Sequence, residues 1–318
     1  MVTHRDEMKS RLLDWFGSAP LLRNGGTVLA PRFFFEAIMA RQSGFGPYCT
    51  LSFDVDFPRD VAALPDLVDQ LQRHGVVASF ACIGRWVREF PDEHRVVVDS
   101  GQELLNHTET HPNLYHPDYE YSTAADLSRH RFNEIGVEER RREIVACHQT
   151  FVEILGRPPV GFRTPHFGHL HVDDIYSSLA ELGYRFSSSV MAADRGNSGV
   201  PFRRADGVWE FPVSPCPDHP FGVLDSWHAI GKRNPRHPRP GELTQMFEAC
   251  ADRVKANGGY LNAYLDPKAC VDSGELERIL GCLLNSGLPI VTYGDLVVSL
   301  ETGATVDVGH GANEIGEE

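Results

Sequence analysis

Two short segments of the sequence carry carboxylates and imidazoles at spacings suited to a catalytic metal. The apolar run that starts at Leu51 ends in Asp54 and Asp56, at the end of an expected buried strand. Further along the chain, three residues separate His107 from His111, so one turn brings both imidazoles together. Three protein ligands and an open position are the arrangement of a hydrolytic zinc site. The sequence therefore predicts an enzyme.

A third segment adds a cation and a restricted backbone. Residues 161–168 read Gly-Phe-Arg-Thr-Pro-His-Phe-Gly, and they follow another expected helix. Each of the three segments is common when taken alone, because Asp-x-Asp often caps a strand and surface histidines are frequent. Their combination in one chain is more specific than any one of them.

The three segments, in this order, resemble the motifs of the polysaccharide deacetylase (NodB-type) family of carbohydrate esterases. The resemblance covers residues 47–300. In that family, the first aspartate of the first motif is the base and the second binds a metal, which corresponds to Asp54 and Asp56 here. The second motif supplies two histidine ligands, which correspond to His107 and His111. The resemblance therefore implies a divalent cofactor; Zn²⁺ is the expected ion, and Co²⁺, Ni²⁺ or Mn²⁺ suit the same ligands.

The resemblance implies hydrolysis of a linear amide. The metal would bind water and the acyl carbonyl, lower the pKa of that water and stabilise the oxyanion. Asp54 would accept the water's proton, because its side chain projects to the same face of the strand as Asp56. Arg163 would orient Asp54 and keep it ionised. His166 stands where the family usually has a tyrosine whose backbone N–H contributes to the oxyanion hole, and its imidazole is a candidate acid.

Two positions depart from the family pattern. Ser187 stands where the family often has an aspartate that holds the third-motif arginine, and Asp266 stands where the general-acid histidine ordinarily lies. Asp266 is a protonated acid, an ionised anchor for a substrate amine or hydroxyl, or inactive in proton transfer while His166 is the acid. A carboxyl donates protons near neutral pH only if burial or a like charge raises its pKa. We expect the ionised anchor, because a cation two shells away would keep the carboxylate charged.

Composition limits the partners and the compartment. The 318 residues include 30 Lys and Arg against 44 Asp and Glu, a formal net charge of −14, so nucleic acid and anionic membrane surfaces would be repelled. The seven cysteines are scattered without a Cys-x-x-Cys pair, which is typical of reduced thiols. Neither a signal-peptide pattern nor a membrane-spanning apolar stretch is present in this sequence. We therefore expect a cytoplasmic protein; assembly into a homo-oligomer is left open.

Apolar runs alternate with amphipathic segments, which predicts a parallel α/β sheet curled into a distorted (β/α) barrel. This NodB-type catalytic domain is expected over residues 47–300, after a helical extension over residues 1–46 and before an acidic, disordered tail over residues 301–318. The expected strands are 48–54, 76–83, 102–106, 159–163, 259–264 and 289–292, and the expected helices are 61–74, 85–100, 137–156, 172–183, 241–256 and 273–286.

Two further segments have alternative interpretations. In the extension, the aromatic triplet Phe33-Phe34-Phe35 follows a Gly-rich turn and either helps a helix to close the barrel or forms a patch for a dimer or a substrate. The insertion at residues 113–136 is rich in Tyr and His, which suits either a lid beside the metal or a solvated loop.

The sequence thus predicts a metal-dependent hydrolase of carbohydrate metabolism that removes an N-acetyl or N-formyl group from an amino sugar. The expected substrate is an oligosaccharide or a nucleotide-linked or lipid-linked precursor. One alternative is a hydrolase of small cyclic amides, similar to allantoinases. The other is a non-catalytic sugar-binding protein that keeps the metal and lacks the acid, as Ser187 and Asp266 suggest.

Overall fold

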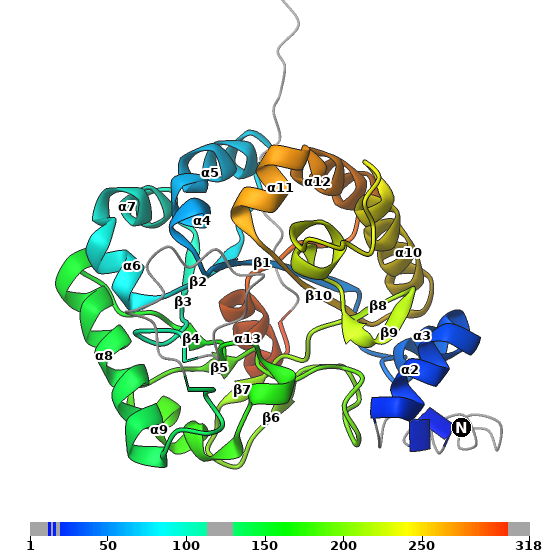
Figure 1. Ribbon diagram of the computed structural model, residues 1–318, viewed down its shortest axis with the longest axis horizontal. Helices are drawn as coiled ribbons and strands as arrows, with labels where there is room; N and C mark the ends of the chain where they lie inside the picture. Colours follow the sequence, from blue (N-terminus) through cyan, green and yellow to red (C-terminus); the bar gives the residue numbers. More distant parts are fainter. Residues whose placement is uncertain (1–11, 14, 17–19, 113–129, 305–318) are drawn as a thin grey trace, which may run out of the picture.

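The chain forms a curled sheet with helices around its outside, as Figure 1 shows for the computed structural model. The structure describes residues 12, 13, 15, 16, 20–112 and 130–304. Eight strands form the main sheet in the order β10-β1-β2-β3-β4-β5-β7-β6. All neighbours are parallel except the antiparallel β6–β7 pair. The predicted distorted barrel is therefore confirmed, in the form of a half-barrel.

The strands of the main sheet are short, apart from β1 and β10. They are β1 (Tyr48–Val55), β2 (Ser79–Cys82), β3 (Glu103–Asn106), β4 (Gly161–Phe162), β5 (Phe186–Ser187), β6 (Phe202–Arg203), β7 (Trp209–Glu210) and β10 (Tyr260–Leu265). A separate antiparallel hairpin consists of β8 (Pro215–Cys216) and β9 (His219–Val223).

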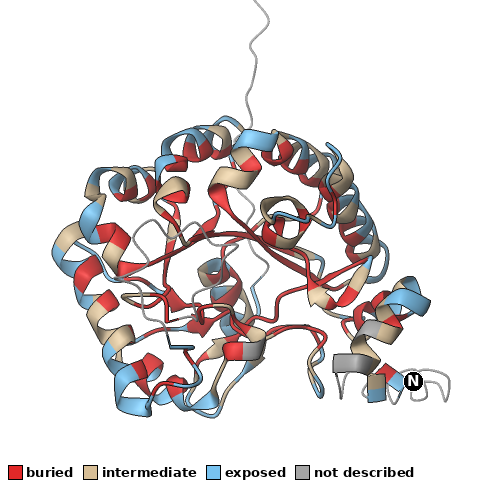
Figure 2. Ribbon diagram, in the orientation of Figure 1, coloured by how far each residue is buried: buried red, intermediate tan, exposed pale blue. Residues whose placement is uncertain are grey.

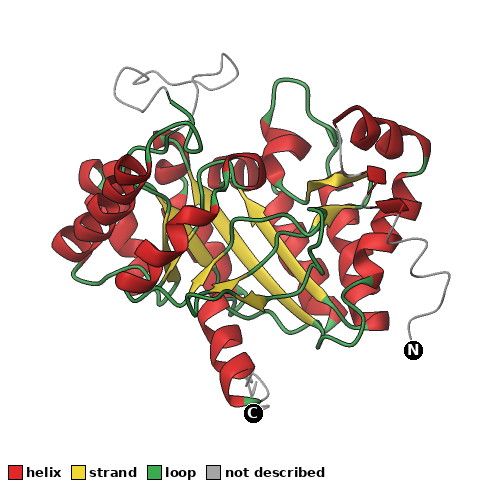
Figure 3. Ribbon diagram, turned by 90° about the horizontal axis from the view of Figure 1, so that it is seen from below, coloured by secondary structure: helices red, strands yellow, loops and turns green. Residues whose placement is uncertain are grey.

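Most helices lie around the outside of the sheet, as Figure 3 shows from below. The helices are α2 (Pro20–Leu29), α3 (Pro31–Ala40), α4 (Pro58–Ala62), α5 (Leu64–Arg73), α6 (Gly84–Glu89), α7 (Pro91–Asp99), α8 (Val137–Leu155), α9 (Tyr176–Glu181), α10 (Glu242–Asn257), α11 (Pro267–Ser273), α12 (Glu275–Ser286) and α13 (Tyr293–Thr302). Helix α13 lies at the centre of the ring in Figure 1. Short 3₁₀ turns occupy η1 (Gly168–Leu170) and η2 (Asp173–Ile175), and η3 (Trp227–Gly231) is a π-helical turn.

The core lies between the sheet and its helices, where Figure 2 shows buried strands and helices that are exposed only on their outer faces. In β1, every residue from Cys49 to Val55 is buried. A parallel strand covered on both faces must be apolar along most of its length, which explains the run that precedes Asp54. Two polar side chains that precede Asp54 in this strand, Thr50 and Ser52, are also fully buried.

An irregular segment after β7 connects the β5 side of the sheet to β10. The backbone N–H of Phe211 donates to Ser187, and that of Ser214 donates to Asn262 in β10. The Asn262 side chain donates to the carbonyls of Phe211 and Pro212 at 2.9 and 3.1 Å. These bonds satisfy backbone groups that the short strands leave unpaired, and they bring β5 and β10 to the same buried centre.

Several predicted elements differ from those observed. Two of the expected helices are each split in two: α4 and α5 replace the helix at 61–74, and α6 and α7 replace the helix at 85–100, where Pro91 begins α7. The expected helix at 172–183 consists of the 3₁₀ turn η2 and α9, and α11 precedes the expected helix at 273–286. The expected strand at 289–292 is reduced to a single bridge between Cys49 and Ile290. Helix α13 was not predicted, and it begins where that strand was expected to end.

The two N-terminal helices pack beside the β8–β9 hairpin, at one end of the molecule in Figure 1. Phe34 and Phe35 are buried, and the Phe34 ring lies 5.1 Å from that of Phe221 in β9. Phe33 is 41% exposed, so most of the aromatic triplet serves packing. The expected Gly-rich turn is wrong, because Gly25 and Gly26 lie within α2.

Two segments with sequence-based expectations are not described by the structure. Most of the predicted lid, residues 113–129, lies outside the described residues, as does the tail from residue 305. Across the described ranges, every helix is too short or too polar to span a membrane.

Candidate metal centre and active site

Asp56, His107 and His111 form one cluster at the carboxyl ends of β1 and β3. Their ligand atoms all lie within 4.8 Å of one another. Oδ1 of Asp56 is 3.2 Å from Nε2 of His107 and 3.6 Å from Nε2 of His111. The carboxyl ends of parallel strands share one edge of a sheet, which explains how residues so far apart in sequence meet.

The donor set fits a metal ion. Oδ1 of Asp56 and Nε2 of His111 are buried and have no hydrogen-bond partner, which is costly unless another group satisfies them. Tetrahedral zinc with ligands at about 2.1 Å separates its ligand atoms by about 3.4 Å, close to the 3.2 and 3.6 Å between these side chains. These residues could therefore hold a divalent cation without rearrangement.

The histidine loop has a strained backbone. The non-glycine residues with positive φ in the described chain are Thr108 at 67°, His111 at 54° and His166 at 49°. Such conformations cost about 1–3 kcal/mol each and persist where the surroundings enforce them. Here the Asn106 side chain accepts a bond from the Thr108 N–H at 2.8 Å, and the Thr108 hydroxyl accepts one from the His111 N–H at 3.0 Å. Thr108 thus shapes the loop through its backbone N–H and its hydroxyl.

The backbone of Arg163 selects the tautomer of His107. Nδ1 of His107 donates to the Arg163 carbonyl at 2.8 Å. Because Nδ1 carries the proton, the Nε2 lone pair is available to a metal. The sequence did not indicate this contact, which depends on β4 lying beside β3.

The Arg163 side chain binds Asp54. Nη1 of Arg163 lies 2.6 Å from Oδ1 of Asp54, and both side chains are buried. Burial raises the pKa of Asp54, and the positive charge of Arg163 opposes that rise. A buried carboxylate held in this way is a stronger proton acceptor than an exposed one, which suits a general base.

A buried network of hydrogen bonds fixes the position of the Arg163 guanidinium. Ser188 accepts from Nε through its carbonyl at 3.2 Å and from Nη2 through its hydroxyl at 3.1 Å. Tyr293 of α13 accepts from Nη2 at 2.7 Å and donates to Asn262 at the same distance. Ser187, expected at the arginine-holding position, instead pairs with Ser189. The neighbouring serine therefore supplies the contact.

The pKa values of Asp56 and His111 both lie below their ordinary values, for different reasons. Burial acts to raise the pKa of Asp56, but His111 and His107 outweigh burial and hold the pKa below its usual range. Burial lowers the pKa of His111 to about 3. A carboxylate beside a neutral imidazole is the form in which both groups bind metals.

A pocket opens beside the cluster and contains residues from four segments of the chain. Aromatic side chains form much of its wall: the Phe57 ring lies 6.1 Å from Trp227, and the Phe167 ring lies 5.0 Å from Tyr264. The lining residues are Asp54, Asp56, Phe57, His166, Phe167, Trp227, His228, Lys232, Tyr264 and Asp266. The sequence analysis did not identify Phe57, Phe167, Trp227, His228, Lys232 or Tyr264 as site residues.

His228 forms a pair with a buried carboxylate. Its Nδ1 lies 3.0 Å from both carboxylate oxygens of Asp225, and the backbone N–H of His228 also donates to Asp225 at 2.6 Å. The pair lies at the start of η3, and Asp225 makes a bridge to Tyr264 of β10. The only sequence signal is the Asp-x-x-His spacing, which is too common to be specific.

Asp266 lies in the same pocket, at the amino end of α11. The Ser226 hydroxyl donates to Oδ2 of Asp266 at 2.6 Å. Burial, followed by the charges of Asp60 and Asp56, raises the pKa of Asp266 well above its ordinary value. Burial and the negative charges of Asp60 and Asp56 oppose the ionised form that the expected anchor requires.

His166 contacts the cluster from the third motif. Its ring centroid lies 5.5 Å from that of His111. Burial lowers the pKa of His166 to about 4, so its imidazole is neutral near pH 7 and makes a poor proton donor there. All seven sequence-predicted site residues therefore lie around the metal cluster or its pocket.

Together the curled parallel sheet, the two-histidine cluster and the paired Asp54 define a half-barrel of the NodB type with a candidate metal centre. Residues 44–187 match the family model described as polysaccharide deacetylase. The recognition made from the motifs is confirmed, and this part of the chain belongs to the polysaccharide deacetylase family.

Similar proteins cover parts of the chain. A peptidoglycan-N-acetylglucosamine deacetylase of Bacillus cereus is 27% identical over 38% of this chain, and a chitooligosaccharide deacetylase of a Bradyrhizobium strain is 35% identical over 29% of it. The matched segments cover 38% and 34% of the two relatives' own lengths.

Solved structures resemble the chain over more of its length. A Mycobacterium smegmatis protein provisionally described as a polysaccharide deacetylase is 18% identical, with a TM-score of 0.63 over 82% of this chain and 92% of that one. A CE4 family pseudoenzyme from Bacillus anthracis is 16% identical, with a TM-score of 0.50 over 79% of this chain and 66% of that one. At these identities, the likeness shows a shared fold.

Proposed function

We propose that this protein is a metal-dependent deacylase that hydrolyses an N-acyl group, most suitably N-acetyl, of an amino sugar. The observation that carries the proposal is the ion pair of Asp54 with Arg163 beside the cluster of Asp56, His107 and His111. The relatives named for deacetylation of peptidoglycan N-acetylglucosamine and chitooligosaccharides favour an N-acetyl amino sugar.

Asp56, His107 and His111 would hold the ion, which would supply Lewis-acid activation of water and of the acyl carbonyl. Asp54 accepts the proton of the attacking water. Arg163 orients Asp54 through the 2.6 Å contact and balances its negative charge. The network of Ser188 and Tyr293 keeps the guanidinium in that position, because a buried arginine has no alternative partner in solvent.

The departing amine needs a proton, and His228 is the donor that the pocket supports best. Asp225 binds Nδ1 of His228, which fixes the orientation of the ring and leaves Nε2 to carry a transferable proton. Asp266 and His166 are the other two donors in the pocket. Low basicity makes His166 the weaker choice.

The aromatic wall favours a sugar over a small polar amide. Phe57, Phe167, Trp227 and Tyr264 line the pocket, and aromatic rings pack against the apolar faces of pyranose rings. Lys232 adds a positive charge to the same pocket, which suits a substrate with an acidic group. A cytoplasmic location is part of the proposal, supported by seven free cysteines, six of them buried.

The test measures release of acetate or formate from chitooligosaccharides, peptidoglycan fragments and N-formyl amino sugars, and the ring-opened product from cyclic ureides. Turnover of an N-acetyl amino sugar by the parent protein, lost in Asp54→Asn, supports the proposal. Turnover of cyclic ureides alone favours the small-amide alternative. Sugar binding without hydrolysis of any substrate favours a binding protein, an alternative that the fold shared with a pseudoenzyme makes relevant.

A further inference from the structure

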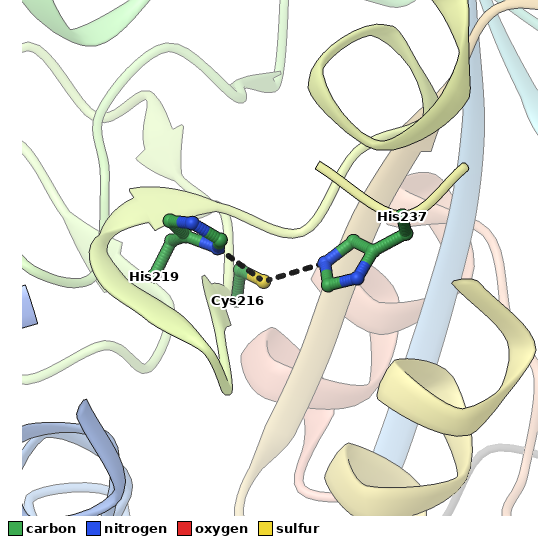
Figure 4. Close-up of side chains that lie close together, drawn as sticks. All are labelled: Cys216, His219 and His237. Atoms are coloured by element: carbon green, nitrogen blue, oxygen red, sulfur yellow. Dashed lines mark hydrogen bonds between the residues drawn. The ribbon is translucent and has the colours of Figure 1, made fainter. Parts of the chain in front are cut away.

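A second group of metal-binding side chains lies in the β8–β9 hairpin and the segment that follows η3. Cys216 belongs to β8, His219 begins β9, and His237 approaches from the later segment (Figure 4). Sγ of Cys216 lies 3.9 Å from Nδ1 of His219 and 3.8 Å from Nε2 of His237. All three ligand atoms are within 4.8 Å of one another.

These distances are close to those of a tetrahedral metal. Zinc binds thiolate at about 2.3 Å and imidazole at about 2.1 Å, so the sulfur and a nitrogen on neighbouring corners of a tetrahedron are about 3.6 Å apart. The observed separations exceed this value by a few tenths of an ångström. A difference of this size is within the reach of a small rotation of the imidazole side chains.

The chemistry of the three residues points the same way. One thiol and two imidazoles form a donor set that zinc prefers, and two of the ligands share one tight turn in Cys-x-x-His spacing. Cys216 and His237 are buried, whereas His219 is half-buried. Cys216 is a free cysteine, so no disulfide accounts for this convergence.

We propose that Cys216, His219 and His237 bind a second divalent metal ion, with zinc as the best-matched element. Three protein ligands would leave a fourth tetrahedral position for water or another ligand. This site is separate from the cluster of Asp56, His107 and His111 and shares no residue with it.

The second ion would brace the wall of the active-site pocket. The backbone N–H of His237 donates to Ala229 at 2.8 Å, and that of Arg236 donates to His228 at 2.9 Å. The ligand segment is therefore bonded to η3, which carries Trp227 and His228. A metal that joins His237 to the hairpin would cross-link η3 to β8 and β9. The second ion would therefore have a structural role.

Cobalt distinguishes the two sites, because only the second contains sulfur. The full-length protein is stripped with a chelator and titrated with Co²⁺ while its absorption spectrum is recorded. A thiolate-to-cobalt band in the near ultraviolet reports the second site alone. We expect two equivalents of Co²⁺ and this band in the parent protein. The double variant His107→Ala/His111→Ala should keep the band and lose one equivalent.

Three variants complete the test. Cys216→Ser should abolish the band and retain the equivalent at the first site, and His237→Gln should shift the titration to higher Co²⁺ concentration. Cys250→Ala is the matched control, since Cys250 is a buried thiol that lies against Pro215, and it should keep the band. A parent protein that binds Co²⁺ without the band, or a band that survives Cys216→Ser, overturns the proposal. If Cys216→Ser does not fold, His237→Gln with an unchanged titration overturns it equally.

Discussion

Residues of this site contribute through their side chains and, in some cases, through their backbone groups. Only the side-chain contributions could be predicted from the sequence. The spacing of Asp54, Asp56, His107 and His111 was enough to predict that they converge. The carbonyl of Arg163 also accepts a hydrogen bond from His107, and the sequence did not indicate this contact. It depends on the neighbouring register of β3 and β4, in which Asn106 lies opposite Phe162.

Residues that join the site from distant segments were also missed, for a physical reason. His228 and Tyr293 follow no motif, and their contacts depend on how the sheet curls to bring β10 beside β1. The choice between Ser187 and Ser188 as the partner of Arg163 depends on the side to which each side chain projects, at the point where β5 ends with Ser187 and the extended chain continues to Ser188. Successive residues on a strand point to opposite faces, so an error of one position exchanges the two roles.

Asp54→Asn tests the general base. The amide keeps the shape of the side chain but cannot accept the proton, so turnover should fall by about a hundredfold or more. The content of bound metal should stay the same, because Asp54 does not belong to the ligand cluster. Metal analysis and steady-state kinetics on the same preparation check both statements. Near-parental turnover would move the base to another residue.

His228→Gln tests the proton donor. A general acid must be protonated to act, so its loss should lower kcat and remove the decline of activity at alkaline pH. The matched variant His166→Gln should leave the alkaline part of the profile in place, because burial holds the pKa of His166 near 4. The pH dependence of kcat, measured for both variants, shows which of the two histidines is the general acid. If His166→Gln alone abolishes the alkaline decline, His166 is the acid and the role proposed for His228 is wrong.

Elements were predicted well where periodicity was long and poorly where glycine, proline or a short strand set the boundary. Helix α8 and the long strands β1 and β10 agree with the predicted ranges to within two residues. Strands β4 and β5 pair through two residues each, which is too short for an alternation pattern. Helix α13 was missed because its start, capped by Thr292 and Asp295, was read as the end of a strand.

Two glycines, one at the end of a helix and one inside a helix, should respond in opposite ways to replacement by alanine. Gly156 ends α8 with a φ of 73°, and a Cβ added there would meet no atom within 4 Å. Gly156→Ala should therefore destabilise the protein by about 1 kcal/mol through backbone strain alone. Gly281 lies inside α12, with equally open surroundings. Gly281→Ala should stabilise by about 0.5–1 kcal/mol, because alanine favours helices.

Urea denaturation of the two glycine variants beside the parent measures these free energies of unfolding. The opposite signs make the pair informative, since both changes add one methyl group to an open position. Equal effects of the same sign would mean that added surface, rather than backbone conformation, determines the outcome.

For the whole molecule, stability depends on buried ionisable groups whose effects on pH dependence oppose one another. Burial raises the pKa of Glu103 to about 7, so the folded state holds its proton more tightly than the unfolded state, and stability is lost as pH rises toward 7. Burial lowers the pKa of His94 to about 4 from 6.5, so stability is lost as pH falls from about 6.5 to 4. The profile of the parent protein sums these effects, and single variants separate them.

His94→Gln isolates the acid side of that profile. His94 is fully buried in α7, where its Nδ1 donates to the Phe90 carbonyl at 2.8 Å and its Nε2 has no hydrogen-bond partner. Protonation of Nε2 would bury an unpaired charge, which disfavours the folded state. A pKa lowered to about 4 corresponds to roughly 3 kcal/mol of stability lost between pH 7 and pH 4. The variant lacks this loss, so the difference in stability between parent and variant should shrink as pH falls.

The matched control for His94→Gln is Glu103→Gln, which should show the opposite trend. Its carboxylate accepts bonds from Ser79 and from the N–H of Gly294, and the glutamine cannot lose a proton as pH rises. The difference between the parent and Glu103→Gln should therefore shrink as pH rises from about 4.5 to 7. Urea denaturation at several pH values within these ranges measures both differences. A difference for His94→Gln that is constant between pH 6.5 and 4 would mean that His94 binds its proton equally well in the folded and unfolded chain, and that other groups set the acid limit of this fold.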